Sequence, residues 1–150
     1  MSFYSFLLFI HIISAILGLG PGFAMIPIVK NAKNMTELRH AYFIRNRIHI
    51  FVMIGGTLLL LTGLGMGILR PSLFTTGWFV VSLILYLLAL AIGPIVLSPK
   101  SRPIKELLKE HPTEEIPDTY YELAKRLFFY ERIENGIFLL VIILMIIKPF

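Results

Sequence analysis

The stretch from Tyr4 to Val29, YSFLLFIHIISAILGLGPGFAMIPIV, contains no Lys, Arg, Asp or Glu. A helix needs about 20 apolar residues to cross the hydrocarbon core of a bilayer, so this stretch is long enough to span a membrane. Residues 48–69 and 77–98 also lack these charged residues. A fourth apolar run ends at residue 147 and is interrupted near its start by Glu134 and Asn135. The sequence therefore predicts four membrane spans, at about 4–29, 48–69, 77–98 and 133–147.

The composition of the whole chain is also that of a membrane protein. Of its 150 residues, 57% are hydrophobic and 15% charged, whereas soluble domains average about 45–50% and about 25%. The absence of cysteine excludes disulfides, thiolate metal sites and cysteine nucleophiles. The expected fold is a single all-α domain over residues 1–150, a polytopic four-helix bundle in the cell membrane, with the lipid bilayer as its first partner.

The basic residues are distributed unevenly between the loops. Twelve of the fourteen Lys and Arg residues lie in two alternate loops, residues 30–47 and 99–132. Loops rich in Lys and Arg stay in the cytoplasm, so both loops are expected to be cytoplasmic and both termini to face outward (N-out, C-out). Because the basic residues flank apolar runs, the net charge of +5 is interpreted as an orientation signal. Nucleic acid is not expected as a partner.

Prolines and glycines mark where the helices change direction. In the longer loop, the pattern predicts a helix over 103–110 and a second helix over 118–147, separated by prolines. The second helix is longer than the hydrocarbon core is thick, so its first turns must project into the cytoplasm. In the spans, Pro21, Pro27 and Pro94 are expected to bend the helices that contain them.

Small residues recur at helical spacing within the spans, as they do where membrane helices pack closely. The stripes are His11, Ala15, Gly18 and Gly22 in the first span, Gly56, Gly63 and Gly67 in the second, and Ser82, Tyr86, Ala89 and Gly93 in the third. They predict a tight bundle in which the parallel first and third spans face each other across small residues.

Three polar residues are expected to lie at equal depth in the outer half of the bundle: His11, Thr62 and Tyr86. Ionisable groups inside a span are costly and usually face the bundle interior or a cavity. The three side chains are therefore predicted to converge. Two interpretations stay open. One is a site for a haem, a metal or a small ligand with His11 as ligand or proton acceptor, and the other is a structural His11 whose ring is hydrogen-bonded by Tyr86, Ser14 or a backbone carbonyl. A haem held by two histidines is excluded, because His49 lies roughly 15 Å deeper than His11.

A second polar layer is expected at the inner edge of the membrane. It consists of Arg45, Arg47 and His49 at the start of the second span, with Glu131 and Glu134 near the start of the fourth. Opposite charges at equal depth should pair, because an unpaired carboxylate in a span is costly. Glu134 is therefore predicted to pair with Arg45, Arg47 or His49. No His residue has the spacing of a metal-ligand set.

Segments 9–18 (FIHIISAILG), 49–67 (HIFVMIGGTLLLLTGLGMG) and 128–135 (FFYERIEN) resemble a family of small bacterial four-span proteins described as a domain of unknown function, number 2269. The resemblance covers nearly the whole chain and implies no assigned activity. More distantly, a His early in the first span followed by small residues is similar to the copper-resistance D proteins and the haem-pathway membrane protoporphyrinogen oxidase. This similarity implies a haem or metal ligand role for His11. The oxidase pattern also has a Lys in the third span, which this sequence lacks.

Three classes of function therefore stay open. A bundle that binds haem, metal or a small ligand predicts colour or metal in the purified protein, whereas a transporter or channel predicts a polar path from His11 to Glu134. A structural or accessory subunit predicts neither and depends on a membrane partner or a second copy. No nucleotide-binding glycine motif, hydrolase triad or pair of intramembrane carboxylates indicates an enzyme.

The distribution of basic residues makes a prediction about topology. A reporter that is active only outside the cytoplasm should be active when fused before Met1 or after Phe150, because both termini are expected to face outward. Fusions in living cells measure this directly. Terminal fusions that are active only with a cytoplasmic reporter would contradict the orientation.

Overall fold

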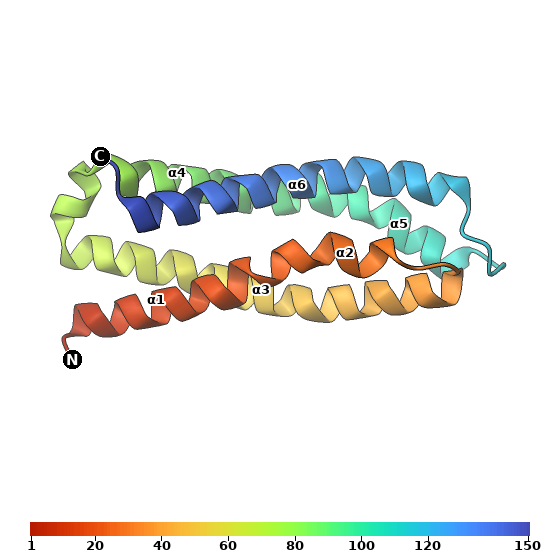
Figure 1. The fold of residues 1–150 in the computed structure, drawn as a ribbon, viewed down its shortest axis with the longest axis horizontal. Coiled ribbons are helices and arrows are strands. Elements are labelled where there is room, and N and C mark those ends of the chain that lie inside the picture. The colour runs from red at the N-terminus through yellow and green to blue at the C-terminus, as the bar shows by residue number, and fades with distance from the viewer.

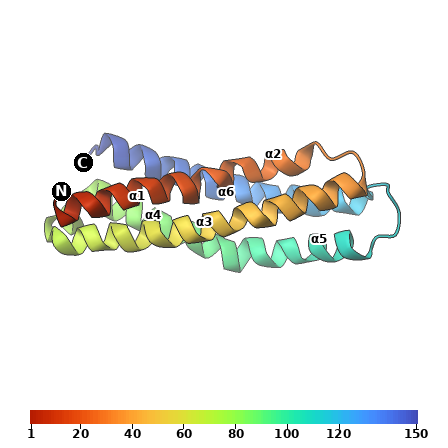
Figure 2. The same ribbon diagram turned by 90° about the horizontal axis from the view of Figure 1, so that it is seen from below.

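The computed structural model describes all residues from 1 to 150 and consists of helices without strands (Figure 1). In chain order the elements are α1 Phe3–Leu19, the 3₁₀ turn η1 Pro21–Ala24, α2 Met25–Lys30, α3 Met35–Leu69, the 3₁₀ turn η2 Pro71–Thr75, α4 Gly77–Ile92, the π-helical turn η3 Gly93–Leu97, α5 Ser98–Glu110 and α6 Asp118–Ile147. Because α2 continues from α1 and α5 continues from α4, the helices form four long rods that lie side by side (Figures 1 and 2). The rods are α1 with α2, α3, α4 with α5, and α6.

Three of the rods are long and apolar enough to cross a membrane. They are Phe3–Lys30, Met35–Leu69 and Gly77–Glu110. The fourth rod, α6, does not meet that description because its uncharged apolar part, Gly136–Ile147, is short. The predicted all-helical fold is confirmed, and three of the four predicted spans lie in helices that could cross a membrane.

The helix type changes at Pro21 and Pro94 as expected, whereas Pro27 lies within α2, which continues as an α-helix to Lys30. Pro21 opens the 3₁₀ turn between α1 and α2, where glycines flank it on both sides. Pro94 lies in the π-helical turn between α4 and α5. Proline lacks the backbone N–H that would continue an α-helical ladder, which accounts for the local change of helix type at each position.

The segments predicted as cytoplasmic loops are largely helical, and the helix predicted to start at residue 103 starts earlier. Residues 35–47 are the first turns of α3, and α5 begins at Ser98 in direct continuation of η3, five residues before the expected start. The helix predicted over 118–147 is confirmed as α6. Together these segments bury the larger of two core clusters: Ile26, Val29, Met35, Leu38, Ala41, Tyr42, Ile104, Leu108, Ile116, Tyr120, Ala124, Leu127 and Phe128. The bundle therefore continues, with its own packed core, well beyond the apolar segments.

The two basic segments are joined at one end of the bundle by the turn between α5 and α6. The backbone N–H of Met35 donates to the Glu114 carbonyl at 2.9 Å, and the Thr36 hydroxyl donates to the Glu114 carboxylate at 2.7 Å. This second bond lowers the pKa of Glu114. Arg39 donates to the carbonyls of Leu108 and His111. Glu114 thus supplements the N-cap of α3, Asn34, and Arg39 binds the last carbonyls of α5.

The four rods pack as two tight pairs, α1 with α3 and α4 with α6. Figure 1 shows α1 and α3 together below α4 and α6. The prediction that the first and third spans face each other across small residues is therefore wrong, because each packs most closely on an antiparallel neighbour. The pairs meet through larger side chains in a second core cluster: Leu19, Leu59, Tyr86, Ala89, Phe138 and Val141.

The tightest approach between helices lies where α1 crosses α3. A Cβ added to Gly18 would lie 2.6 Å from the carbonyl carbon of Gly55 and 2.6 Å from the nitrogen of Gly56. Real Cβ atoms do not approach backbone so closely, so only glycine permits this crossing. The small-residue stripe of the first span is thus a packing surface for α3.

This crossing predicts a strong effect of a single methyl group. Gly18→Ala should destabilise the protein by about 1–3 kcal/mol, because the two backbones must separate to accept the Cβ. Gly136→Ala is the matched control, since nothing lies within 4 Å of a Cβ at that position. Thermal melting in detergent measures both variants. Equal melting temperatures for Gly18→Ala and Gly136→Ala would contradict the crossing.

Candidate functional site

The antiparallel register of α1 and α3 brings His11 against Thr62. His11 lies seven residues before Gly18, and Thr62 seven residues after Gly55. The His11 Nδ1 atom lies 2.8 Å from the Thr62 hydroxyl oxygen. A Cβ at Gly63 would lie 3.2 Å from the His11 ring, so this glycine makes room for the imidazole. The predicted meeting of His11 and Thr62 is confirmed.

Hydrogen bonding around Thr62 orients the imidazole. The Thr62 hydroxyl also lies 2.7 Å from the Leu58 carbonyl oxygen, to which it can only donate. With its single hydrogen directed there, the hydroxyl accepts from the N–H at His11 Nδ1. His11 Nε2 is then the unprotonated nitrogen of the neutral ring.

Tyr86 does not join this pair. Its hydroxyl donates to the Gly56 carbonyl oxygen at 2.7 Å, and its ring lies 5.8 Å from the ring of Phe138. Gly56 is seven residues from Gly63 along α3, which corresponds to about 10 Å of helix. The prediction that Tyr86 hydrogen-bonds the His11 ring is therefore wrong.

Ser82 lies one turn from Tyr86 on the buried face of α4. It is completely buried, and its hydroxyl oxygen has no hydrogen-bond partner in the structure. Phe79, three residues before it, packs near Gly67 of α3. Because the two helices are antiparallel, Ser82 lies close to the depth of Gly63 and thus of His11. Sequence analysis treated Ser82 only as a small packing residue.

A heptad-like stripe carries two carboxylates into the core on α6. Its members follow each other at alternating spacings of four and three residues, the spacing of a buried helix face. They are Tyr120, Ala124, Leu127, Glu131, Glu134, Phe138, Val141 and Met145. Glu131 is buried and Glu134 half-buried. Two consecutive core positions of this helix are therefore acidic, a pairing that the sequence analysis did not recognise.

Glu131 pairs with Arg45 of α3 in the one salt bridge of the structure. The two side chains are only 9% and 12% exposed, and the Arg45 guanidinium lies 5.6 Å from the Tyr42 ring centroid and 5.9 Å from that of Phe128. The second carboxylate oxygen of Glu131 is buried and unpartnered. The sequence predicted an ion pair in the inner polar layer, and the structure contains one, but its carboxylate belongs to Glu131. The prediction for Glu134 is wrong, because Glu134 forms no salt bridge.

The other basic residues of the inner layer face away from α6. Arg47 is exposed and lies over the Phe43 ring at 5.2 Å, and His49 is also exposed. They lie two and four residues after Arg45 on α3, so the helix turns them away from the buried face. Asn135 approaches Gly22, with its side-chain amide donating to the Gly22 carbonyl at 3.4 Å.

Seven polar side chains that are buried or half-buried lie one after another along the bundle, and we call them the polar column. From the basic end toward the termini, its members are Arg45, Glu131, Glu134, Tyr86, Ser82, Thr62 and His11. They come from α1, α3, α4 and α6, so all four rods contribute. Carboxylates, hydroxyls and an imidazole are the groups that accept and pass on protons. No group of three or more His, Asp, Glu or Cys residues comes together as a metal site would require.

The ion pair predicts that substitutions of Arg45 and of Arg47 change the stability of the protein by different amounts. Arg45→Gln should destabilise the protein by about 3–5 kcal/mol, because it leaves Glu131 buried without a counter-charge. Arg47→Gln removes the same charge from an exposed position two residues away and should have little effect. Thermal melting in detergent compares the two. The pair has no structural role if both variants melt at the same temperature.

Comparison with known proteins places these helices in a family. A family profile described as "Predicted integral membrane protein (DUF2269)" matches residues 5–149. No curated protein and no solved structure matches the chain. The match covers almost all of the sequence and agrees with the apolar helices of the structure. The chain therefore belongs to this family and is a multi-pass integral membrane protein.

Proposed function

We propose that the protein crosses the membrane four times with both termini outside. Both basic segments lie at one end of the bundle, where Arg39 and Glu114 join them, and both termini lie at the other end (Figure 1). This arrangement agrees with the retention of basic segments in the cytoplasm. The fourth crossing is the apolar part of α6, which runs alongside α4.

Within this topology, we propose that the protein passes protons along the polar column. The observation that carries the proposal is the succession of ionisable and hydroxyl groups from the Arg45–Glu131 pair to the His11–Thr62 pair. Ionisable residues in membrane bundles commonly form proton relays. The buried oxygens of Ser82 and Glu131 that lack partners support the same view, because such atoms are suited to transient water or proton binding.

The residues would have distinct roles. Glu134 faces the core without an ion pair and is the proton acceptor on the cytoplasmic side. Tyr86 and Ser82 supply hydroxyls in the middle of the column, and His11 exchanges protons on the outer side through Nε2. Glu131 is paired with Arg45, so it orients the entrance, and the unpaired Glu134 carries the proton.

Proton flux into vesicles tests this function. Vesicles containing the protein and an internal pH-sensitive dye should acidify faster than protein-free vesicles under an imposed potential. Glu134→Gln should slow this flux about 100-fold, since a positioned acid–base group typically contributes that much to proton transfer. Glu122→Gln, which changes an exposed residue of the same helix, is the control. Wild-type flux no greater than in protein-free vesicles would refute the function.

A ligand site at His11 is the second candidate, and one observation favours it. Ligating histidines usually donate their other ring N–H to a neighbouring acceptor, as His11 does to Thr62. This leaves Nε2 to bind a haem, a metal or a small ligand. An absorption spectrum and metal analysis of the purified protein, compared with His11→Ala, distinguish this candidate from proton transfer. A colourless, metal-free protein with proton flux would exclude a haem or metal role.

A further inference from the structure

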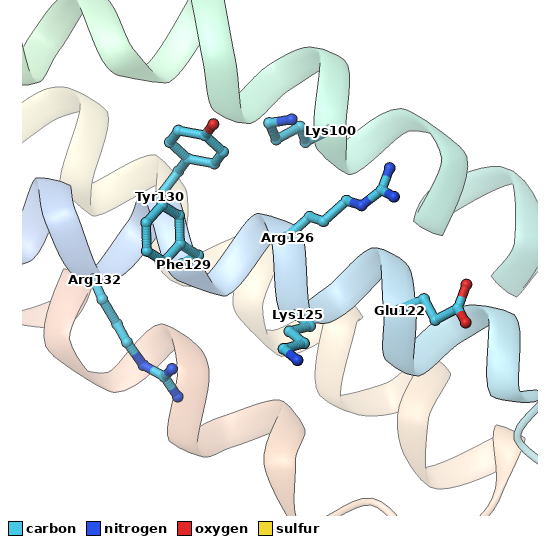
Figure 3. Close-up of a pocket in the computed structure, with 7 residues that line it drawn as sticks. All are labelled: Lys100, Glu122, Lys125, Arg126, Phe129, Tyr130 and Arg132. Carbon is cyan, nitrogen blue, oxygen red and sulfur yellow. The ribbon is translucent and has the colours of Figure 1, made fainter.

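A groove of about 790 Å³ lies along α6 near the end of its charged half. Figure 3 shows its lining side chains on both sides of α6 and on the neighbouring α5. The cations and rings that line it are Lys100, Lys125, Arg126, Arg132, Phe129 and Tyr130. Glu122 is the only carboxylate among the lining residues, so the groove carries a net charge of +3 (four cations less one anion).

None of these four cations is neutralised within the protein. The one salt bridge of the structure is Arg45–Glu131, so neither Arg126 nor any other groove cation is paired with Glu122. Lys100 is held over the Tyr130 ring, with its Nζ atom 4.9 Å from the ring centroid. Four like charges around one hollow repel each other, and an anion between them relieves that repulsion.

The outward face of α6 changes from basic to apolar directly beside the groove. Phe129 is 58% exposed, and Ile133, Leu140 and Ile143 are 41%, 45% and 42% exposed. These residues follow each other, with Gly136 between them, at spacings of three or four residues, so they form one stripe. Nothing lies within 4 Å of a Cβ placed at Gly136, which leaves a gap in the stripe. An amphiphile with an anionic head and an apolar tail matches this arrangement.

We propose that the groove binds the phosphate headgroup of an anionic phospholipid from the inner leaflet. The phosphate lies between Lys125, Arg126 and Arg132, and an acyl chain runs past Gly136 along the apolar stripe. Basic pockets at the cytoplasmic end of membrane helices bind such headgroups. The proposal rests on the proposed orientation of the bundle and is independent of proton passage.

Lipid binding by the intact protein tests the proposal. The protein is purified in a neutral detergent, and its binding of phosphatidylglycerol and of phosphatidylcholine is measured by native mass spectrometry. The variant Lys125→Ala, Arg126→Ala, Arg132→Ala should bind phosphatidylglycerol about 100-fold more weakly than the wild type, given the usual contribution of each cation near an anionic lipid. The control Arg102→Ala, Lys105→Ala, Lys109→Ala removes three exposed cations from α5 outside the groove and should bind as the wild type does.

Three outcomes would overturn the proposal. They are equal binding of the two lipids by the wild type, equal loss of binding in both triple variants, and displacement of the lipid by an equal concentration of inorganic phosphate. The last would show a site for free phosphate. Melting curves of both triple variants confirm that they are folded. Because lipid binding and proton flux are measured separately, selective binding without flux would refute only the proposed function.

Discussion

The contact between the backbones of Gly18 and Gly55–Gly56 determines how the rest of the polar interior is arranged. Once these glycines are in register, His11 must meet Thr62 two turns toward the termini. In the opposite direction, the same register brings Arg45 close enough to the Met25 carbonyl for a hydrogen bond of 3.4 Å. One steric constraint thus positions the histidine at one end of the polar column and the arginine at the other.

The Arg45–Glu131 pair shows how the fold accommodates charge on a core stripe. Removing both ions from water is costly, and their attraction offsets that cost only with good geometry and further contacts. The rings of Tyr42 and Phe128 provide such contacts by lying close to the guanidinium. The ion pair also lies where the apolar part of the bundle meets the part built from the basic segments. The larger core cluster lies in that part and includes Tyr42 and Phe128. The packing of this core cluster therefore stabilises the Arg45–Glu131 ion pair.

The sequence was sufficient for features that depend on one helix at a time. The uncharged run 4–29 predicted a spanning helix, and the extent of α6 followed from the prolines before it. Equal depth also predicted the contact of His11 with Thr62, since depth depends only on rise per residue. Errors arose where the rotation of one helix against another decides the outcome. Tyr86 hydrogen-bonds Gly56 instead of His11, and Arg45 pairs with Glu131 instead of Glu134. The direction of a side chain changes by about 100° per residue, and the depth of a residue in the membrane does not tell which helix it faces.

Close packing limits what can move along the polar column. The backbones of α1 and α3 touch at Gly18, and the groove along α6 includes no residue of the column. A solute of several atoms would have to separate helices whose small residues fit without space for a Cβ. A proton needs no such space, but it needs a hydrogen bond at each step, and the direct side-chain hydrogen bonds of the column are those of its two ends, Arg45–Glu131 and His11–Thr62. For the proposed function, the close approach of α1 and α3 at Gly18 therefore restricts passage between these two helices to protons.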